Sequence, residues 1–250
     1  MFLCKNCLLK LRNKSLRNNR LQENNMTTFS EVFENLIPEL RTTILKRVQQ
    51  WKPKAGYRSV WEDFEEVITP LLIDALKKSR LKITDENITI PQTKSVYPDM
   101  KISYQGNLYA IDIKSGDTKI KQPWYDMGRM DTFEEKHLEK YQDEYYVTVR
   151  WEDKENPKFV NVYIEPMRWS VGIDANHKCI LFRPYDGKIR PKSWEDFENG
   201  KVYWHSKEDF RKSFEIAKNY RRMYFIKEWY KEFDKEQRSE VIKELNKIDK

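Results

Sequence analysis

The spacing of hydrophobic residues changes twice along the chain, and each change marks a change of predicted structure. Apolar residues recur every three to four positions over residues 28–50 and again over residues 60–78, which is typical of amphipathic helices. Thr28 or Ser30 precedes the first pattern as a polar cap. Each segment contains a proline, which we expect to bend or interrupt its helix because proline cannot donate a backbone hydrogen bond.

A period of two governs the middle of the chain. Five segments alternate between apolar and polar residues as strands do, namely ITIPQ, MKISYQ, LYAIDIK, EYYVTVRW and FVNVYIEPMRW. A polar, helix-like stretch around residues 133–141 separates the third from the fourth, and residues 172–192 are irregular and basic. Helical spacing returns after Ser206 and continues in a charged helix to Lys250. Helices, then a mixed or mostly antiparallel sheet, then helices predict an α/β or α+β fold.

The composition indicates a folded protein whose basic charge is concentrated at one end. The chain has 250 residues, 14% of them aromatic, which is enough for a core in one large domain or two small ones. It has no run of about 18 apolar residues that would span a membrane. Residues 1–25 carry +5 of the formal net charge of +7, and the remainder carries only +2. Any affinity for nucleic acid must therefore come from local patches.

The basic residues 1–25 are interpreted as a disordered arm, a leader-like segment or sequence upstream of a true start at Met26, and the last alternative is favoured. The chain contains three cysteines. So few exclude a disulfide framework and favour a reducing, cytoplasmic environment. Cys4 and Cys7 have the spacing of half a zinc site. Because Cys179 lies far away in the sequence, we interpret the pair as incidental thiols.

Two acids and a lysine stand out in YPDMKISYQGNLYAIDIKSGDT, residues 97–118. Strand alternation places Asp112 and Lys114 on one face, opposite three apolar side chains. Those side chains are Tyr109, Ile111 and Ile113. Asp99 can meet Asp112 if residues 103–107 turn the chain back. Two converging carboxylates with open positions suit Mg²⁺, and Lys114 can position a water and help to deprotonate it for attack on a phosphodiester.

The bare pattern, an acid two residues before a lysine, is common in this chain. It occurs again at Glu134, Glu152 and Asp186. A solvated ion pair on an exposed strand face therefore stays open as an alternative at this point. The apolar strand around Asp112, and the Pro-Asp pair at a hairpin's distance from it, favour the metal site.

The stretch YPDMKISYQGNLYAIDIK resembles the active-site motif of the PD-(D/E)xK nucleases, in particular the EcoRV-like type II restriction endonucleases. The similarity continues upstream in FEEVITPLL, and downstream in VNVYIEPMRWSVGID and in DFENGKVYWHSKEDF with KNY. These blocks keep the same order over roughly residues 60–220. The resemblance implies a restriction-endonuclease-like fold, with a central mixed β-sheet flanked by helices.

The resemblance also implies that residues 26–250 form a single domain of four parts. The parts are an N-terminal helix and dimerisation segment at 26–58, a catalytic core at 60–165, a DNA-recognition segment at 166–205 and C-terminal helices at 206–250.

Carried over position by position, the resemblance assigns catalytic roles. Asp99 and Asp112 would bind catalytic Mg²⁺, and the carbonyl of Ile113 would add a ligand. Lys114 would orient the attacking water and stabilise the charge that develops on the phosphate. Glu65 would be an accessory acid near the metal, with an ordinary solvated helix residue as the alternative.

DNA contacts are expected at two places. One is a group in the position of the loop that reads the major groove, where these residue types can pair with bases. Its members are Asp174, Asn176, His177 and Lys178. The other is Lys119 with Lys121, which follow the catalytic strand and would track phosphates. A solvated loop and an exposed basic strand end are the respective alternatives.

The expected activity is that of a type II restriction endonuclease, which cuts both strands of double-stranded DNA at a short palindromic site and leaves blunt ends. We expect a homodimer. The helical residues 28–50 are its candidate interface, and packing in the protein's own core is an equal alternative. A DNA methyltransferase of matching specificity is the expected genetic neighbour. Another nuclease of the superfamily that reads DNA shape, and a non-catalytic DNA-binding protein of the same fold, stay open as alternatives.

Overall fold

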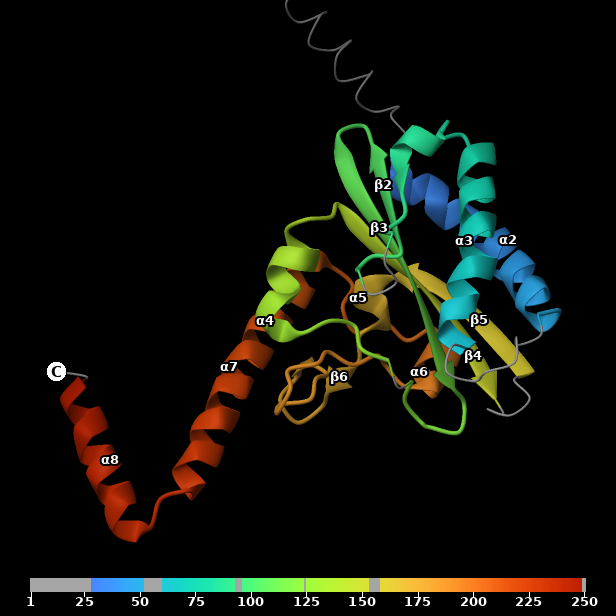
Figure 1. Ribbon diagram of the computed structural model, residues 1–250. Helices are drawn as coiled ribbons and strands as arrows, with labels where there is room; N and C mark the ends of the chain where they lie inside the picture. Colours follow the sequence, from blue (N-terminus) through green and yellow to red (C-terminus); the bar gives the residue numbers. More distant parts are fainter. Residues whose placement is uncertain (1–27, 52–59, 93–95, 124, 153–157, 249–250) are drawn as a thin grey trace, which may run out of the picture.

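A mixed sheet of five strands forms the centre of the computed structural model (Figure 1), which describes residues 28–51, 60–92, 96–123, 125–152 and 158–248. The strands lie in chain order as β1 (Ile88–Thr89), β2 (Met100–Tyr104), β3 (Asn107–Asp117), β4 (Asp143–Glu152) and β5 (Lys158–Pro166). β3 and β4 pair in parallel, and the other neighbours are antiparallel. The predicted α/β architecture, a central mixed sheet with flanking helices, is confirmed. The predictions about residues 1–25, including Cys4 and Cys7, lie outside the described residues.

Two long helices, α2 (Phe29–Gln49) and α3 (Val60–Lys78), pack against one face of the sheet (Figure 1). Thr28 and Glu31 form a capping box at the start of α2, which satisfies backbone groups that the helix leaves unpaired. The apolar stripe of α2 is buried in the same core as the inward side chains of β3 to β5. This stripe is therefore occupied within the chain, as the core-packing alternative expects.

Neither proline interrupts its helix. α2 continues past Pro38, and α3 continues past Pro70. Both prolines are exposed, so the carbonyl that loses its partner one turn earlier lies on the solvent side. Burial of the opposite, apolar face outweighs the loss of one hydrogen bond. Of the two expected outcomes, interruption is wrong, and a bend stays a prediction.

A tight hairpin joins β2 to β3. Its two turn residues, Gln105 and Gly106, have φ angles of +50° and +77°, and Tyr104 pairs with Asn107 directly across the turn. A two-residue turn with positive φ at both positions matches the right-handed twist of the strands. The register is thereby fixed, and Met100 lies opposite Ile111.

The other face of the sheet carries shorter elements and a second apolar core. These elements are α4 (Met130–Phe133), η2 (Glu134–Leu138), α5 (Met167–Ser170), β6 (Ile173–Asp174), β7 (Cys179–Ile180) and α6 (Trp194–Glu198). The short η1 (Asp85–Asn87) instead lies next to β1 and β2. Then α7 (Lys207–Lys231) begins behind its cap Ser206, and α8 (Lys235–Ile248) follows. Figure 1 shows α7 running away from the sheet and α8 turning back to form a V with it.

Two predicted strands are shorter than expected. Of ITIPQ only Ile88–Thr89 pairs with β2, and the segment soon reaches Pro91, which has no N–H to donate. The predicted strand FVNVYIEPMRW ends at Pro166, after which Met167–Ser170 is helical. Within the described residues, no helix combines the length and the apolar character needed to cross a bilayer.

Candidate active site

The β2–β3 hairpin brings Asp99 opposite Asp112. Asp99 directly precedes β2, and its Oδ2 accepts a hydrogen bond of 2.6 Å from the backbone N–H of Ile113. Asp112 lies on β3 with only 2% of its surface exposed. The turn at Gln105 and Gly106 sets this register, so the predicted meeting of the two carboxylates is what the structure shows.

Lys114 lies on the same face of β3 as Asp112, and the two form an ion pair. Tyr146, on the neighbouring strand β4, places its ring 5.8 Å from the Lys114 Nζ. Tyr109, Ile111 and Ile113 belong to the apolar core on the opposite face. The exposed, solvated ion pair is therefore not what the structure shows. The pair is sequestered, since the Lys114 side chain is only 22% exposed.

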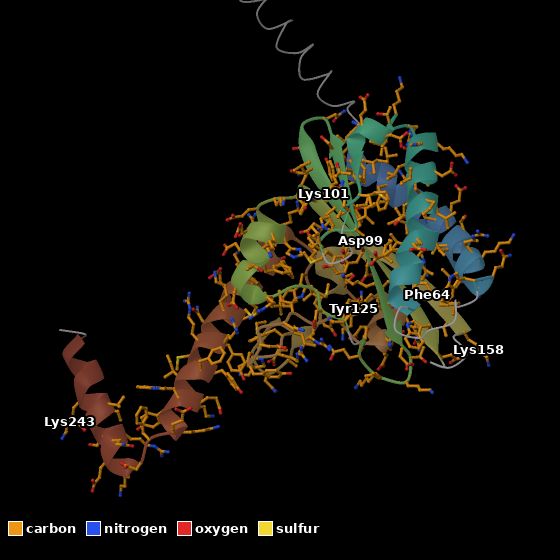
Figure 2. The ribbon with its side chains drawn as sticks, in the orientation of Figure 1. Phe64, Asp99, Lys101, Tyr125, Lys158 and Lys243 are labelled. Atoms are coloured by element: carbon orange, nitrogen blue, oxygen red, sulfur yellow. The ribbon has the colours of Figure 1, made fainter. Side chains whose placement is uncertain are left out.

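Glu65 reaches the same region from helix α3. It lines a cleft of about 590 Å³ together with Asp99, and Asp99 lies between the sheet and α3 in Figure 2. Apolar residues, Ile73, Ile90 and Pro91 among them, also line the cleft. Substrate can therefore approach Asp99 from the side on which Glu65 lies.

The electrostatics of the site follow from its burial. Desolvation and the nearby charge of Asp112 raise the pKa of Asp99 to about 8, and Glu65 acts in the same direction. Burial alone would lower the pKa of Lys114, but the negative charges of Asp112, Asp99 and Glu65 outweigh burial and raise it. Lys114 is therefore held as an ammonium, while Asp99 needs an additional positive charge to ionise fully near neutral pH.

The available carboxylates suit Mg²⁺, and they do not suit a metal ion that is enclosed by protein ligands alone. Among the described residues, no group of three or more His, Cys, Asp and Glu is arranged to hold a metal ion. Mg²⁺ commonly uses one or two carboxylates with waters and substrate phosphates. Oδ2 of Asp112 is buried and has the Lys114 ion pair but no hydrogen bond from the described residues. Asp99 and Asp112 therefore fit, and the roles of Glu65 and Ile113 as ligands stay predictions.

The four residues predicted to read bases form a separate group on the β6–β7 hairpin. Asp174 accepts hydrogen bonds from the backbone N–H groups of Asn176 (2.9 Å) and His177 (3.3 Å), and from the His177 ring (2.9 Å). Burial would raise the pKa of Asp174, but these bonds outweigh it and lower the pKa. The His177 ring stacks on Tyr220 of α7 at 3.7 Å. Asp174 and His177 thus stabilise the turn itself.

The remaining predicted DNA contacts are open to solvent. Asn176 and Lys178 are exposed at the tip of the hairpin, and Lys119 and Lys121 are exposed after β3. Within the described ranges, the amide of Asn176 and the three ammonium groups have no hydrogen-bond or ion-pair partner in the protein. These side chains are free to contact a ligand, and their roles stay predictions.

Comparison with known proteins adds a structural likeness. No protein-family model matches the sequence, and no curated protein matches it either. Among solved structures, the chain is similar to "NlaIV restriction endonuclease", with a TM-score of 0.47 and 14% sequence identity, over 76% of this chain and 78% of that chain. A function for this chain therefore has to be argued from the residues of its own site.

A buried polar network beside the site was not foreseen from the sequence. Glu144 on β4 accepts a hydrogen bond from the hydroxyl of Tyr97, and its Oε2 lies 2.8 Å from Nδ1 of His137. The His137 ring lies between Tyr97 and Phe133, at 4.2 and 4.1 Å. The network ties the segment before Asp99 to the sheet. The sequence nevertheless contained a signal for Glu144, because alternation along EYYVTVRW puts this residue on the same sheet face as Asp112.

A second acid–lysine pair lies on the same face, with its lysine fully buried and its glutamate largely buried, and for this pair the sequence held no signal. Lys192, which is 1% exposed, places its Nζ 2.9 Å from Oε1 of Glu165 on β5. Ser170 also donates to Glu165, at 2.8 Å. The two residues are 27 positions apart, so no local pattern could have paired them.

Proposed function

We propose that the protein is a Mg²⁺-dependent type II restriction endonuclease that hydrolyses both strands of a short palindromic DNA duplex and leaves blunt ends. The observation that supports this best is the convergence of Asp99, Asp112 and Lys114 at the β2–β3 hairpin, next to a cleft that Glu65 lines. A buried carboxylate (Asp112), a half-buried one (Asp99) and an ammonium are the groups that hydrolysis of a phosphodiester needs in one place.

In the proposed reaction a water oxygen attacks phosphorus, one phosphorus–oxygen bond to a sugar breaks, and the water loses a proton while the leaving oxygen gains one. Mg²⁺, when bound, would supply positive charge to the phosphate and to the attacking oxygen. Asp99 and Asp112 would hold it.

Lys114 acts as a donor in this arrangement. Since its pKa is raised by the surrounding carboxylates, it stays protonated, orients the water and donates to the charge that develops on the phosphate. Asp112 fixes the ammonium by the ion pair, and Tyr146 limits its movement from the other side. Removal of the water's proton by Lys114 is accordingly disfavoured in the metal-free site.

The partners follow from the same proposal. Double-stranded DNA is the substrate, with Asn176 and Lys178 as base readers and Lys119 and Lys121 as phosphate contacts. A palindromic site is matched by a two-fold homodimer. The enzyme would act in the cytoplasm, and a methyltransferase of the same specificity, encoded nearby, would protect the host DNA.

The decisive experiment digests mixed plasmid and phage DNA with Mg²⁺ and compares the wild type with Asp112→Asn. The wild type should give discrete, reproducible fragments, and Asp112→Asn should lose at least about 100-fold in rate while it still folds and binds DNA. Glu134→Gln is the matched control, because Glu134 also stands two residues before a lysine but is exposed, and it should cut normally.

Two results would point elsewhere. A smear, or nicking that depends on DNA structure, would indicate another nuclease of the superfamily. A wild-type protein that cuts no DNA with Mg²⁺ or Mn²⁺ would exclude the enzymatic function and leave a DNA-binding protein.

A further inference from the structure

The part of the chain that extends from the body exposes an unusual number of large apolar side chains. We call residues 216–248, the second half of α7 with α8, the C-terminal arm (Figure 1). Six large hydrophobic side chains of the arm are between two and three fifths exposed. They are Ile216, Met223, Phe225, Ile226, Trp229 and Ile242. A helix that is apolar on more than one side is normally covered, so the exposure of these side chains is unusual.

The arm carries both a hollow and a ridge. The hollow, of about 730 Å³, lies between α7 and α8 and reaches the β6–β7 hairpin. Met223, Ile226, Ile242 and His177 are among the residues that line it. The ridge consists of Phe225 and Trp229, one helical turn apart, which are not among the residues that line the hollow. Phe233 supports the ridge, since its ring packs edge-on against Trp229 at 4.6 Å.

The hollow is large enough to take more than one side chain of a partner. Its volume of about 730 Å³ exceeds by several-fold the volume of one large side chain. Two aromatic rings that project from a helix can enter such a hollow, and aromatic side chains bury about 150–250 Å² each.

The exposed area matches what a pair of identical arms requires. Six half-exposed large side chains present on the order of 500–600 Å² of apolar surface per copy. Two copies together would bury more than about 1,000 Å², which approaches the size of a standard stable interface before any polar rim is counted. An unrelated partner would need a complementary ridge and hollow of its own.

The charge of the arm argues against nucleic acid as the occupant. Over residues 216–248 nine Lys and Arg alternate with six Asp and Glu. Several of these are paired within the chain, as are Lys231 with Glu228 and Arg221 with Asp131. Interleaved charges of both signs suit another protein surface of the same kind, whereas a phosphate backbone selects for bases without acids.

We propose that the C-terminal arm is a homodimer interface in which the Phe225–Trp229 ridge of one copy fills the α7–α8 hollow of its partner. In a two-fold symmetric dimer both hollows are filled, because each copy supplies a ridge and a hollow. The apolar stripe of α2, the interface expected from the sequence, is buried in the protein's own core. A dimer that cuts both strands of a palindrome rests on the proposed function, but the ridge and the hollow do not.

The test is the mass in solution, measured by gel filtration with light scattering, without DNA and without divalent cations. The wild type should be a dimer at micromolar concentration, and Trp229→Glu should weaken dimerisation at least about 30-fold, as expected for a central aromatic anchor. Val160→Glu is the matched control, since Val160 is 41% exposed on β5, away from the arm, and it should stay dimeric.

A second variant protects the test against a local loss of structure. Ile226→Glu places the charge in the hollow instead of on the ridge, and it should also give monomers with unchanged helix content by circular dichroism. A wild type that is monomeric up to about 100 μM, or two arm variants that remain dimers, would overturn the proposal.

The outcome separates the interface from the nuclease function. If both proposals hold, monomeric Trp229→Glu should accumulate nicked circular plasmid before linear DNA, whereas the wild type should cut both strands together. A wild-type dimer that the arm variants dissociate, but that cuts no DNA, would keep the interface and reject the nuclease.

Discussion

At the scale of single residues, the metal-free protein holds two carboxylates closer together than their charges favour. Asp99 and Asp112 share the space at the start of the β2–β3 hairpin, and Lys114 pairs with only one of them, Asp112. Desolvation and the charge of Asp112 therefore raise the pKa of Asp99 to about 8. A free carboxyl titrates near 4, so Asp99 loses its proton much more easily in the unfolded chain than in the folded one.

This difference predicts a pH-dependent stability in the absence of metal. A carboxyl whose folded pKa is raised favours the folded state below about pH 4 and loses that contribution as the pH rises through about 8. Asp99→Asn should therefore melt at least about 3 °C above the wild type at pH 9 in EDTA, and the gain should shrink toward pH 5. Thermal melts across this range measure it. The exposed control Glu240→Gln should show no such trend, and a gain for Asp99→Asn that is the same at both pH values would contradict the assignment.

Removing the lysine of the Glu165–Lys192 pair should lower the stability of the protein, whereas Asp99→Asn should raise it, and the change should be larger. Burial raises the pKa of Glu165, and Lys192 counteracts that effect. Lys192→Met would leave a buried carboxylate without its cation, which costs about 3–5 kcal/mol. Urea unfolding at pH 7.5 should show this loss. The loss should become smaller at pH 5, because protonation removes the unpaired charge, and it should also shrink in the double variant Glu165→Gln with Lys192→Met.

At the scale of elements, the base-reading role assigned to the β6–β7 hairpin depends on how closely the hairpin packs at its base. A Cβ on Gly172 would lie 2.9 Å from Leu181 Cδ2 and 2.9 Å from the backbone oxygen of Pro191. The Gly172 N–H also donates to Arg190 at 3.1 Å, and its carbonyl accepts from Leu181 at 2.8 Å. The glycine is thus required by close approach of neighbouring backbone, and the hairpin has a defined position relative to residues 181–191.

Gly172→Ala should consequently displace the hairpin. We expect a loss of about 1–3 kcal/mol in stability, typical of overpacking, and weaker binding of duplex DNA in Ca²⁺ because Asn176 and Lys178 move with the hairpin. Urea unfolding and fluorescence anisotropy measure the two effects. Ala175→Ser, at the exposed tip of the same hairpin, should leave both unchanged, and a Gly172→Ala protein of wild-type stability would show that the packing tolerates the methyl group.

At the scale of the whole molecule, we expect the fold to be independent of the proposed metal. Two apolar cores, one on each face of the sheet, hold the helices in place, and the described residues contain no cluster of three metal-binding side chains. Stability and activity should therefore respond differently to the removal of divalent cations.

Dialysis against EDTA should abolish DNA cleavage and leave the far-UV circular dichroism spectrum unchanged, and Mg²⁺ or Mn²⁺ should restore cleavage. Plasmid assays before and after dialysis test this. Undiminished cleavage in EDTA would reject the role assigned to Asp99 and Asp112, and unfolding in EDTA would reveal a structural metal that the described residues do not show.

The sequence by itself determined the features that depend on local periodicity and local chemistry. Alternation placed Asp112 and Lys114 on the face opposite Tyr109, Ile111 and Ile113, because successive residues of a strand point to opposite sides. The cap at Thr28 and the polar start at Ser206 located two helices within one residue. The interruption of the helix expected at Pro38 does not occur, since the cost of a proline is small when the free carbonyl faces solvent.

Only the tertiary structure decided which distant residues meet and which apolar surfaces stay open. It brought Glu65 to the cleft of Asp99, joined Glu165 to Lys192 and stacked His177 on Tyr220. It also buried the apolar stripe of α2 and left apolar residues on more than one side of the C-terminal arm exposed. Both segments carry large apolar residues in the sequence. Periodicity shows that a face is apolar, but what covers the face depends on the packing of elements far apart in the chain.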